Sequence, residues 1–298
     1  MTSSQKRRRG WWRWLGSALA LTALAWWASR QDWEALVSAV QQVSLGVVLG
    51  AWALYALGLV VNAWRWYVLL TGVGVRVPWP RAVKLTFAGS FASNFLPSTI
   101  GGDALRITGI LGDAAAHEAL ASVIVDRALN VLAMYSFLPL TLLTYGGMFP
   151  SLTAERRNMA AALGFGKGWS AVRRHVLRFW EAFTLWMGAP RVLLAGVGIA
   201  WLSLIPPFTA TWIVARGLGI PVAWYQVAGT TVISYTLSLL PVSVNGYGVR
   251  EATLTGLYGL LGATPAQALA LALLTRLLMW GSTLMGGLWV GEAVPHRE

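Results

Sequence analysis

Long apolar runs separated by short polar segments limit the fold of this chain more than any other feature. They cover residues 15–28, 45–70, 119–145, 192–214 and 266–290. A bilayer core is crossed by about 20 helical residues, and a helix satisfies its own backbone hydrogen bonds there. Charged residues make up 11% of the chain and the mean hydropathy is +0.59, which is outside the range of soluble domains. The sequence therefore predicts an all-α polytopic membrane protein with about seven crossing elements (range about six to eight).

The composition also excludes several classes of function. The formal net charge of +12 would suggest nucleic-acid binding in a soluble protein, but cytoplasmic loops of membrane proteins are normally basic. The absence of cysteine excludes disulfides and thiolate metal sites, and three histidines offer little for a metal. We expect no metal, no cofactor and no nucleic-acid partner.

Basic segments suggest how the chain is oriented. Residues 1–44 hold a cluster of lysine and arginine before the first apolar run, which predicts a transmembrane helix with a cytoplasmic N-terminus. Trp26 and Trp27 at its end fit an interfacial belt better than a signal-peptide cleavage site. Residues 150–190 are rich in arginine, and we expect 169–186 to be an amphipathic helix facing the anionic bilayer surface, with a plain solvated connector as the alternative. Residues 292–298 form a short tail.

One polar segment, Asn94–Arg106 (N-F-L-P-S-T-I-G-G-D-A-L-R), interrupts the apolar sequence. Exposed backbone groups and charges at bilayer depth cost several kcal/mol, so such a break indicates a function. A second segment, Leu240–Arg250 (L-P-V-S-V-N-G-Y-G-V-R), matches it in order and spacing. Proline and glycine release a chain from helical geometry, so we expect short half-helices (85–96 and 104–111 in the first segment) beside both breaks. The expected break residues are Pro97, Gly101, Gly102, Pro241, Gly246 and Gly248.

Two further matches indicate an internal repeat. The glycine turn at Gly72 resembles the one at Gly217, and D-R-A-L at Asp126 resembles T-R-L-L at Thr275. Residues 45–149 and 191–291 therefore form two copies of one unit. The first turn is more basic than the second, which places them on opposite sides and predicts an inverted repeat if the broken segments cross the bilayer. Broken segments that cross the bilayer give three crossings between the two turns. Re-entrant hairpins are the alternative, and they give two crossings, which would put the weakly charged second turn on the cytoplasmic side.

The breaks create candidate anion sites, because the N-terminus of a half-helix carries unpaired amides and a partial positive charge. Arg106 and Arg250 are expected at the starts of such half-helices, and a guanidinium suits phosphate. The substrate-binding candidates are Arg106, Arg127, Arg250, Arg276, Asn94 and Asn245. The acids Asp103, Asp126 and Glu251 are coupling or ion-pair candidates. The alternative is a set of internal ion pairs that tie the two repeats together.

These motifs resemble a known family. The pattern N-x-L-P-x-x-x-G-G-D-x-x-R, then V-D-R, then P-x-S-x-N-G-x-G-x-R-E, is similar to the transmembrane, flippase-type domain of lysylphosphatidylglycerol synthetases. The chain resembles a stand-alone member without the aminoacyl-transferase domain, so that enzymatic activity is not carried over. The resemblance implies lipid handling in a bacterial or archaeal cell (inner) membrane, including phospholipid transfer between leaflets or a role with polyprenyl-linked sugars.

The sequence thus predicts a flippase or lipid transporter that receives an anionic headgroup between two broken helices. We expect no enzymatic activity, since no nucleotide-binding or catalytic motif is present in the sequence. An intramembrane lipid-modifying enzyme with Asp103 or Glu251 as its base is one alternative. A membrane partner subunit of a lipid or glycan synthesis enzyme is another, and a homo-oligomer is a further candidate assembly.

Overall fold

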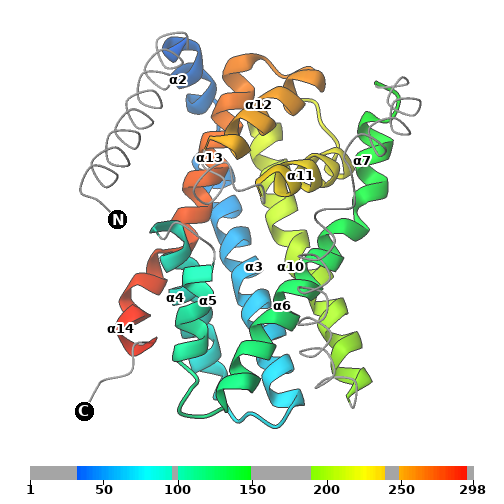
Figure 1. The fold of residues 1–298 in the computed structure, drawn as a ribbon. Helices are drawn as coiled ribbons and strands as arrows, with labels where there is room; N and C mark the ends of the chain where they lie inside the picture. Colours follow the sequence, from blue (N-terminus) through cyan, green and yellow to red (C-terminus); the bar gives the residue numbers. More distant parts are fainter. Residues whose placement is uncertain (1–31, 96–99, 149–188, 239–247, 294–298) are drawn as a thin grey trace, which may run out of the picture.

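The computed structural model describes residues 32–95, 100–148, 189–238 and 248–293, and every regular element in these ranges is helical. The helices pack into one bundle (Figure 1). In chain order they are α2 (Trp33–Gln41), α3 (Leu45–Gly72), α4 (Trp79–Phe95), α5 (Ile100–Thr108), α6 (Ala116–Ser136), α7 (Leu138–Tyr145), α10 (Pro190–Gly217), α11 (Trp224–Ser238), α12 (Val249–Leu260), α13 (Pro265–Thr283), the 3-10 helix η2 (Leu284–Trp289) and α14 (Val290–Ala293). The predicted all-α class is confirmed for this part of the chain.

Four helical stretches of the described chain are long and apolar enough to cross a bilayer. They are Leu45–Gly72, Ala116–Tyr145, Pro190–Gly217 and Pro265–Trp289, and they coincide with four of the predicted runs. The chain is therefore a multi-pass membrane protein. The run 15–28 and nearly all of the 150–190 connector lie outside the described residues, and the count of seven crossings is not confirmed.

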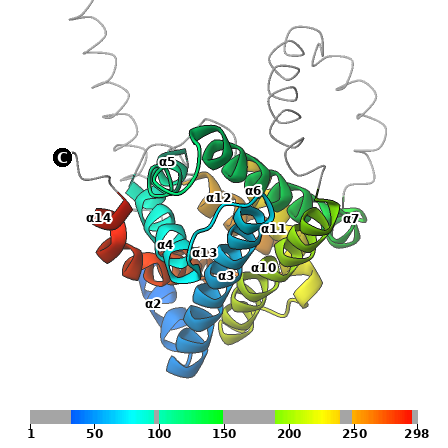
Figure 2. The same cartoon turned by 90° about the horizontal axis from the view of Figure 1, so that it is seen from below.

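Helices α3 and α10 pack against each other along their length (Figures 1 and 2). A Cβ atom added to Gly72 at the end of α3 would lie 2.4 Å from Val192 at the start of α10. A Cβ atom added to Gly217 at the end of α10 would lie 3.3 Å from Val47 at the start of α3. The two helices are therefore antiparallel, and their close approach depends on these glycines.

These two contacts are related by the internal repeat. Gly72 and Gly217 are 145 positions apart (217 − 72), and so are Val47 and Val192 (192 − 47). Replacing each residue of one contact by its match gives the other contact. The α3–α10 pair thus has the pattern of an isologous interface, in which one patch contacts its own equivalent.

The turns that follow α3 and α10 also share one conformation. Gly74 and Gly219 have φ angles of 86° and 76°, in the left-handed region that favours glycine at helix ends. The Val75 amide donates to the Leu70 carbonyl at 3.1 Å, and the Ile220 amide donates to that of Ala215 at 3.0 Å. Because α3 and α10 are antiparallel, the two turns lie at opposite ends of the bundle (Figure 1).

Helices α4 and α5 form an antiparallel hairpin. Gly102 of α5 packs on Gly89 of α4, while Gly109, just after α5, packs on Leu85 nearer the start of α4. The expectation that Gly101 and Gly102 break the helix is wrong, because both lie inside α5, which begins at Ile100 rather than at 104. Gly102 is small for a packing reason instead, since a Cβ atom there would lie 2.1 Å from the Gly89 carbonyl oxygen.

The second predicted break is described only in part. Gly248 has a φ of 81° and immediately precedes α12, so it is not helical. Pro97 of the first break and Pro241, Asn245 and Gly246 of the second lie outside the described residues.

Candidate functional site

The first of two polar clusters, here called the first arginine centre, consists of Arg65, Arg106 and Asp126. Asp126 of α6 accepts hydrogen bonds from Arg65 Nε of α3 at 2.7 Å and from Arg106 Nη2 of α5 at 3.0 Å. Arg65 and Asp126 are each 2% exposed and Arg106 is 6% exposed. A single carboxylate therefore compensates two buried guanidinium groups from two different helices.

Other groups also contact these arginines, although Arg106 Nε is buried without a hydrogen-bond partner in the described residues. Arg65 Nη1 donates to Asn130 at 3.2 Å and to Ser203 of α10 at 3.4 Å. The Arg106 guanidinium lies over the Trp66 ring, 4.2 Å from its centroid, in a cation–π contact. Arg65, which lies between Trp64 and Trp66 in the sequence, is therefore buried inside the bundle. The sequence contains one sign of this burial. The polar residue Asn62 lies one helical turn before Arg65, and its side chain accepts a hydrogen bond from Arg65.

Asp103 adds a second acid beside this centre. It lies 3.7 Å from Arg106 Nη1 and accepts a hydrogen bond from Arg127 Nε. Arg106 belongs to the last turn of α5, so its predicted place at the start of a half-helix is corrected. Asp126 and Arg127, although adjacent in sequence, have different partners, as expected for neighbours on a helix.

The second arginine centre consists of Arg250, Glu251, Thr275 and Arg276. Arg276 Nε of α13 donates to Glu251 Oε1 of α12 at 2.7 Å. The other carboxylate oxygen of Glu251 accepts the Gly248 amide at 2.8 Å, which caps α12. Arg250, the second residue of α12, donates from Nη2 to the Thr275 hydroxyl at 3.4 Å.

The two centres make equivalent contacts. In the repeat, Arg106 matches Arg250 and Asp126 matches Thr275, and each arginine donates from Nη2 to its partner on the next long helix. The chemical difference is large, because the carboxylate of the first centre is replaced by a neutral hydroxyl. Nη1 of Arg250 is buried and has no hydrogen-bond partner in the described part of the chain.

Tyrosines surround the second centre. Tyr258 of α12 is fully buried, and its hydroxyl also has no hydrogen-bond partner among the described residues. Arg250 interacts electrostatically with Tyr258 and with Tyr55 of α3. The Tyr55 hydroxyl is hydrogen-bonded to Thr211 of α10 at 2.9 Å. The arrangement leaves one positive group and one hydroxyl available inside the bundle.

The ion pairs of both centres run within one repeat unit. Arg65, Arg106 and Arg127 pair with acids of the first unit, and Arg276 pairs with Glu251 of the second. The alternative in which ion pairs tie the two units together is thus not what the described residues show. A neutral bond does connect the units, because Asn94 of α4 donates to Thr283 of α13 at 2.9 Å.

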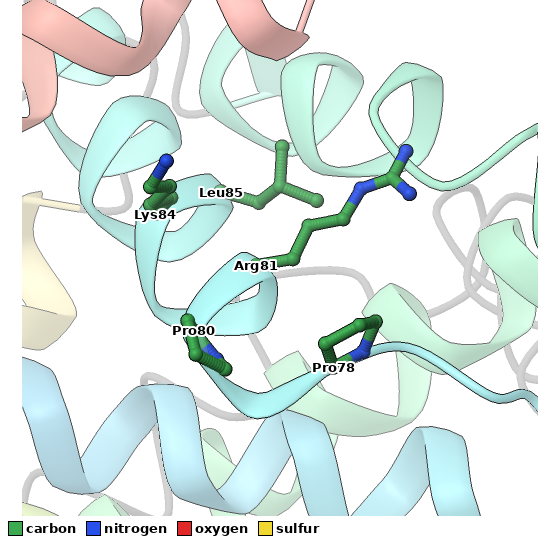
Figure 3. Close-up of a pocket in the computed structure, with 5 residues that line it drawn as sticks. All are labelled: Pro78, Pro80, Arg81, Lys84 and Leu85. Carbon is green, nitrogen blue, oxygen red and sulfur yellow. The ribbon is translucent and has the colours of Figure 1, made fainter.

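A separate pocket of about 280 Å³ lies at the start of α4 and is lined by Pro78, Pro80, Arg81, Lys84 and Leu85 (Figure 3). Arg81 is paired with Asp113 at 2.8 Å and donates to the Gly109 carbonyl at 2.8 Å. Because its arginine is already compensated, this pocket is a weaker anion site than the second arginine centre. The described residues also contain no group of three or more acids or histidines that could hold a metal ion.

Comparison with known proteins gives one family. Residues 13–172 and 148–287 each match a family model described as the lysylphosphatidylglycerol synthase TM region. The two segments overlap and together cover residues 13–287. No curated protein matches the sequence.

Proposed function

The chain belongs to the lysylphosphatidylglycerol synthase TM region family, and from this premise we propose that it is a lipid flippase or transporter that binds an anionic, phosphate-bearing headgroup inside the membrane. The headgroup contacts are Arg106, Arg127, Arg250 and Arg276, with Asn94 and Asn245 beside the breaks. Asp103, Asp126 and Glu251 serve as ion-pair or coupling groups.

One observation carries this proposal: Arg250 Nη1 is buried in an apolar helical bundle without a partner in the described residues. A buried charge inside a membrane protein is costly, so the retention of Arg250 without a carboxylate partner in the described residues needs a reason. A phosphate is the anion that best fits the fork of a guanidinium. The membrane itself supplies such anions as lipid headgroups.

The geometry favours two successive headgroup stations over one two-sided site. The first centre touches α3 at Arg65 and the second is in electrostatic reach of Tyr55 on the same helix. Ten residues of α-helix separate these points, which is about 15 Å. A single phosphate does not span that distance, so the headgroup passes from one centre to the other. The antiparallel α3–α10 pair supports an inverted repeat, in which the stations serve opposite leaflets.

We place the protein in a bacterial or archaeal inner membrane with its N-terminus in the cytoplasm and with about seven crossing elements. Residues 150–190 then face the anionic bilayer surface. The ligand is an anionic phospholipid or a polyprenyl-phosphate-linked lipid, and a homo-oligomer or a lipid-synthesis enzyme is a candidate partner.

An intramembrane enzyme is the less favoured alternative. Its two candidate bases, Asp103 and Glu251, are both engaged in ion pairs with arginines. Both carboxylates are therefore already occupied by arginine donors. A partner subunit without activity of its own remains the other alternative, for which copurification with a stoichiometric enzyme is the test.

Transport in liposomes tests the proposal. We expect purified protein to accelerate the exposure of fluorescent phospholipid, and Arg250→Gln to slow it by about tenfold to a hundredfold, since a hydrogen bond to a charged group contributes about 1.5 to 3 kcal/mol. The matched control is Arg76→Gln, which removes an exposed arginine of the turn after α3 and leaves the rate unchanged. Equal rates with and without protein, for phospholipids and for polyprenyl phosphates, would refute the function.

A further inference from the structure

The second arginine centre contains two buried donors that no group in the described residues uses. They are Nη1 of Arg250 and the hydroxyl of Tyr258, whose side chain is fully buried. Both residues belong to α12, eight positions apart and about 80° around the helix, and Arg250 is within electrostatic reach of Tyr258. A buried polar group without a hydrogen bond is expensive, and two such groups near each other indicate a missing acceptor.

The charge of the centre limits what that acceptor can be. Arg250 and Arg276 bring two positive charges and Glu251 brings one negative charge, which leaves one positive charge. Glu251 is held by Arg276 and by the Gly248 amide, so it does not neutralise Arg250. A ligand with one negative charge balances the centre, whereas a doubly charged ligand leaves a buried charge without a partner.

Resting on the proposed function, we propose that the second arginine centre binds one singly charged phosphate group, as in a phosphodiester headgroup, with Arg250 Nη1 and the Tyr258 hydroxyl as its donors. The first centre is the weaker station, because Asp126 stands in the place of Thr275 and Arg106 Nη1 lies 3.7 Å from Asp103, so acids already balance its arginines. Thr275 is therefore the residue that keeps the second centre open, since its neutral hydroxyl satisfies one guanidinium nitrogen without cancelling the charge.

Binding measured in detergent micelles by isothermal titration tests this assignment. At pH 8 we expect short-chain phosphatidylglycerol, a singly charged diester, to bind at least tenfold more tightly than short-chain phosphatidic acid, whose monoester then carries close to two charges. Equal affinity for the two lipids would overturn the proposal. Inorganic phosphate at pH 6, where it is mainly singly charged, is the third arm. Binding as tight as that of the diester lipid would overturn the lipid headgroup as the source of the anion.

Two variants identify the residues. Thr275→Asp rebuilds the acid of the first centre beside Arg250, and we expect it to lower diester affinity at least tenfold, whereas the neutral control Thr275→Asn retains affinity within a few-fold. Tyr258→Phe removes a hydroxyl that no described group uses, so we expect weaker binding with an unchanged unfolding midpoint. Wild-type affinity in both Thr275→Asp and Tyr258→Phe would refute the site.

The same measurements separate this inference from the proposed function. Tight diester binding that depends on Thr275 and Tyr258, with no lipid transfer in liposomes, would reject transport and keep the site. Lipid transfer that is unaffected by Thr275→Asp would keep transport and reject the site.

Discussion

Replacing Asp126 by alanine should destabilise the helical bundle by about 3 to 5 kcal/mol, the usual loss when one partner of a buried ion pair is removed. Asp126 receives hydrogen bonds from both Arg65 and Arg106, and all three side chains are nearly inaccessible. The alanine variant leaves two buried guanidinium groups without their shared acid. Denaturant or thermal unfolding in detergent micelles measures the loss.

Asp113→Ala is the matched control for this change. Asp113 pairs with Arg81 near the surface, where the two side chains are 25% and 43% exposed. An exposed pair contributes at most about 1 kcal/mol, so the control should unfold almost as the wild type does. Similar losses for the two variants would mean that Asp126 is not the buried link between α3, α5 and α6.

The second large effect is expected for Gly102→Ala. The added Cβ atom would lie 2.1 Å from the Gly89 carbonyl oxygen and 2.1 Å from the Ser93 hydroxyl, where backbone and side chain cannot both yield. Overpacking of this kind costs about 1 to 3 kcal/mol and here pushes α5 away from α4. Because Arg106 lies one turn further along α5, we also expect weaker anionic-lipid binding.

Gly256→Ala is the control, since Gly256 is an exposed glycine inside α12 with nothing within 4 Å of an added Cβ atom. Alanine is the better helix former by about 1 kcal/mol, so this variant should be as stable as the wild type or slightly more so. Unfolding midpoints and lipid-binding curves of the two variants give the comparison. A stable Gly102→Ala variant with normal binding would contradict the close α4–α5 packing.

The spanning helices were predictable because a run of apolar residues is a local signal. The sequence places them at 45–70, 119–145, 192–214 and 266–290, and the structure gives Leu45–Gly72, Ala116–Tyr145, Pro190–Gly217 and Pro265–Trp289. The equivalence of Arg106 and Arg250 was also available from sequence, through the repeated motifs. The match of D-R-A-L with T-R-L-L also shows that Thr275 of the second unit stands where the first unit has Asp126.

The residues whose roles the sequence did not predict are those whose structural partners lie on another helix. The sequence pattern around Gly102 predicts a helix break, but its small size serves contact with Gly89 on the opposite helix of the hairpin. Arg65 sits between two tryptophans and looks interfacial, yet its partner Asp126 is 61 positions away. A pattern of neighbouring residues carries no information about such partners, and tertiary packing decides between the two interpretations.

The two glycine–valine contacts between α3 and α10, which the internal repeat relates to each other, have an energetic consequence. If the helices tilt against each other so that the Gly72–Val192 end opens and the Gly217–Val47 end closes, the reverse tilt gives an arrangement built from the matched contacts. Two conformations related in this way differ little in free energy, because each loses packing contacts at one end of the helix pair and the other loses the matching contacts at the opposite end. A ligand then needs only a small difference in affinity between the two conformations to change their populations severalfold.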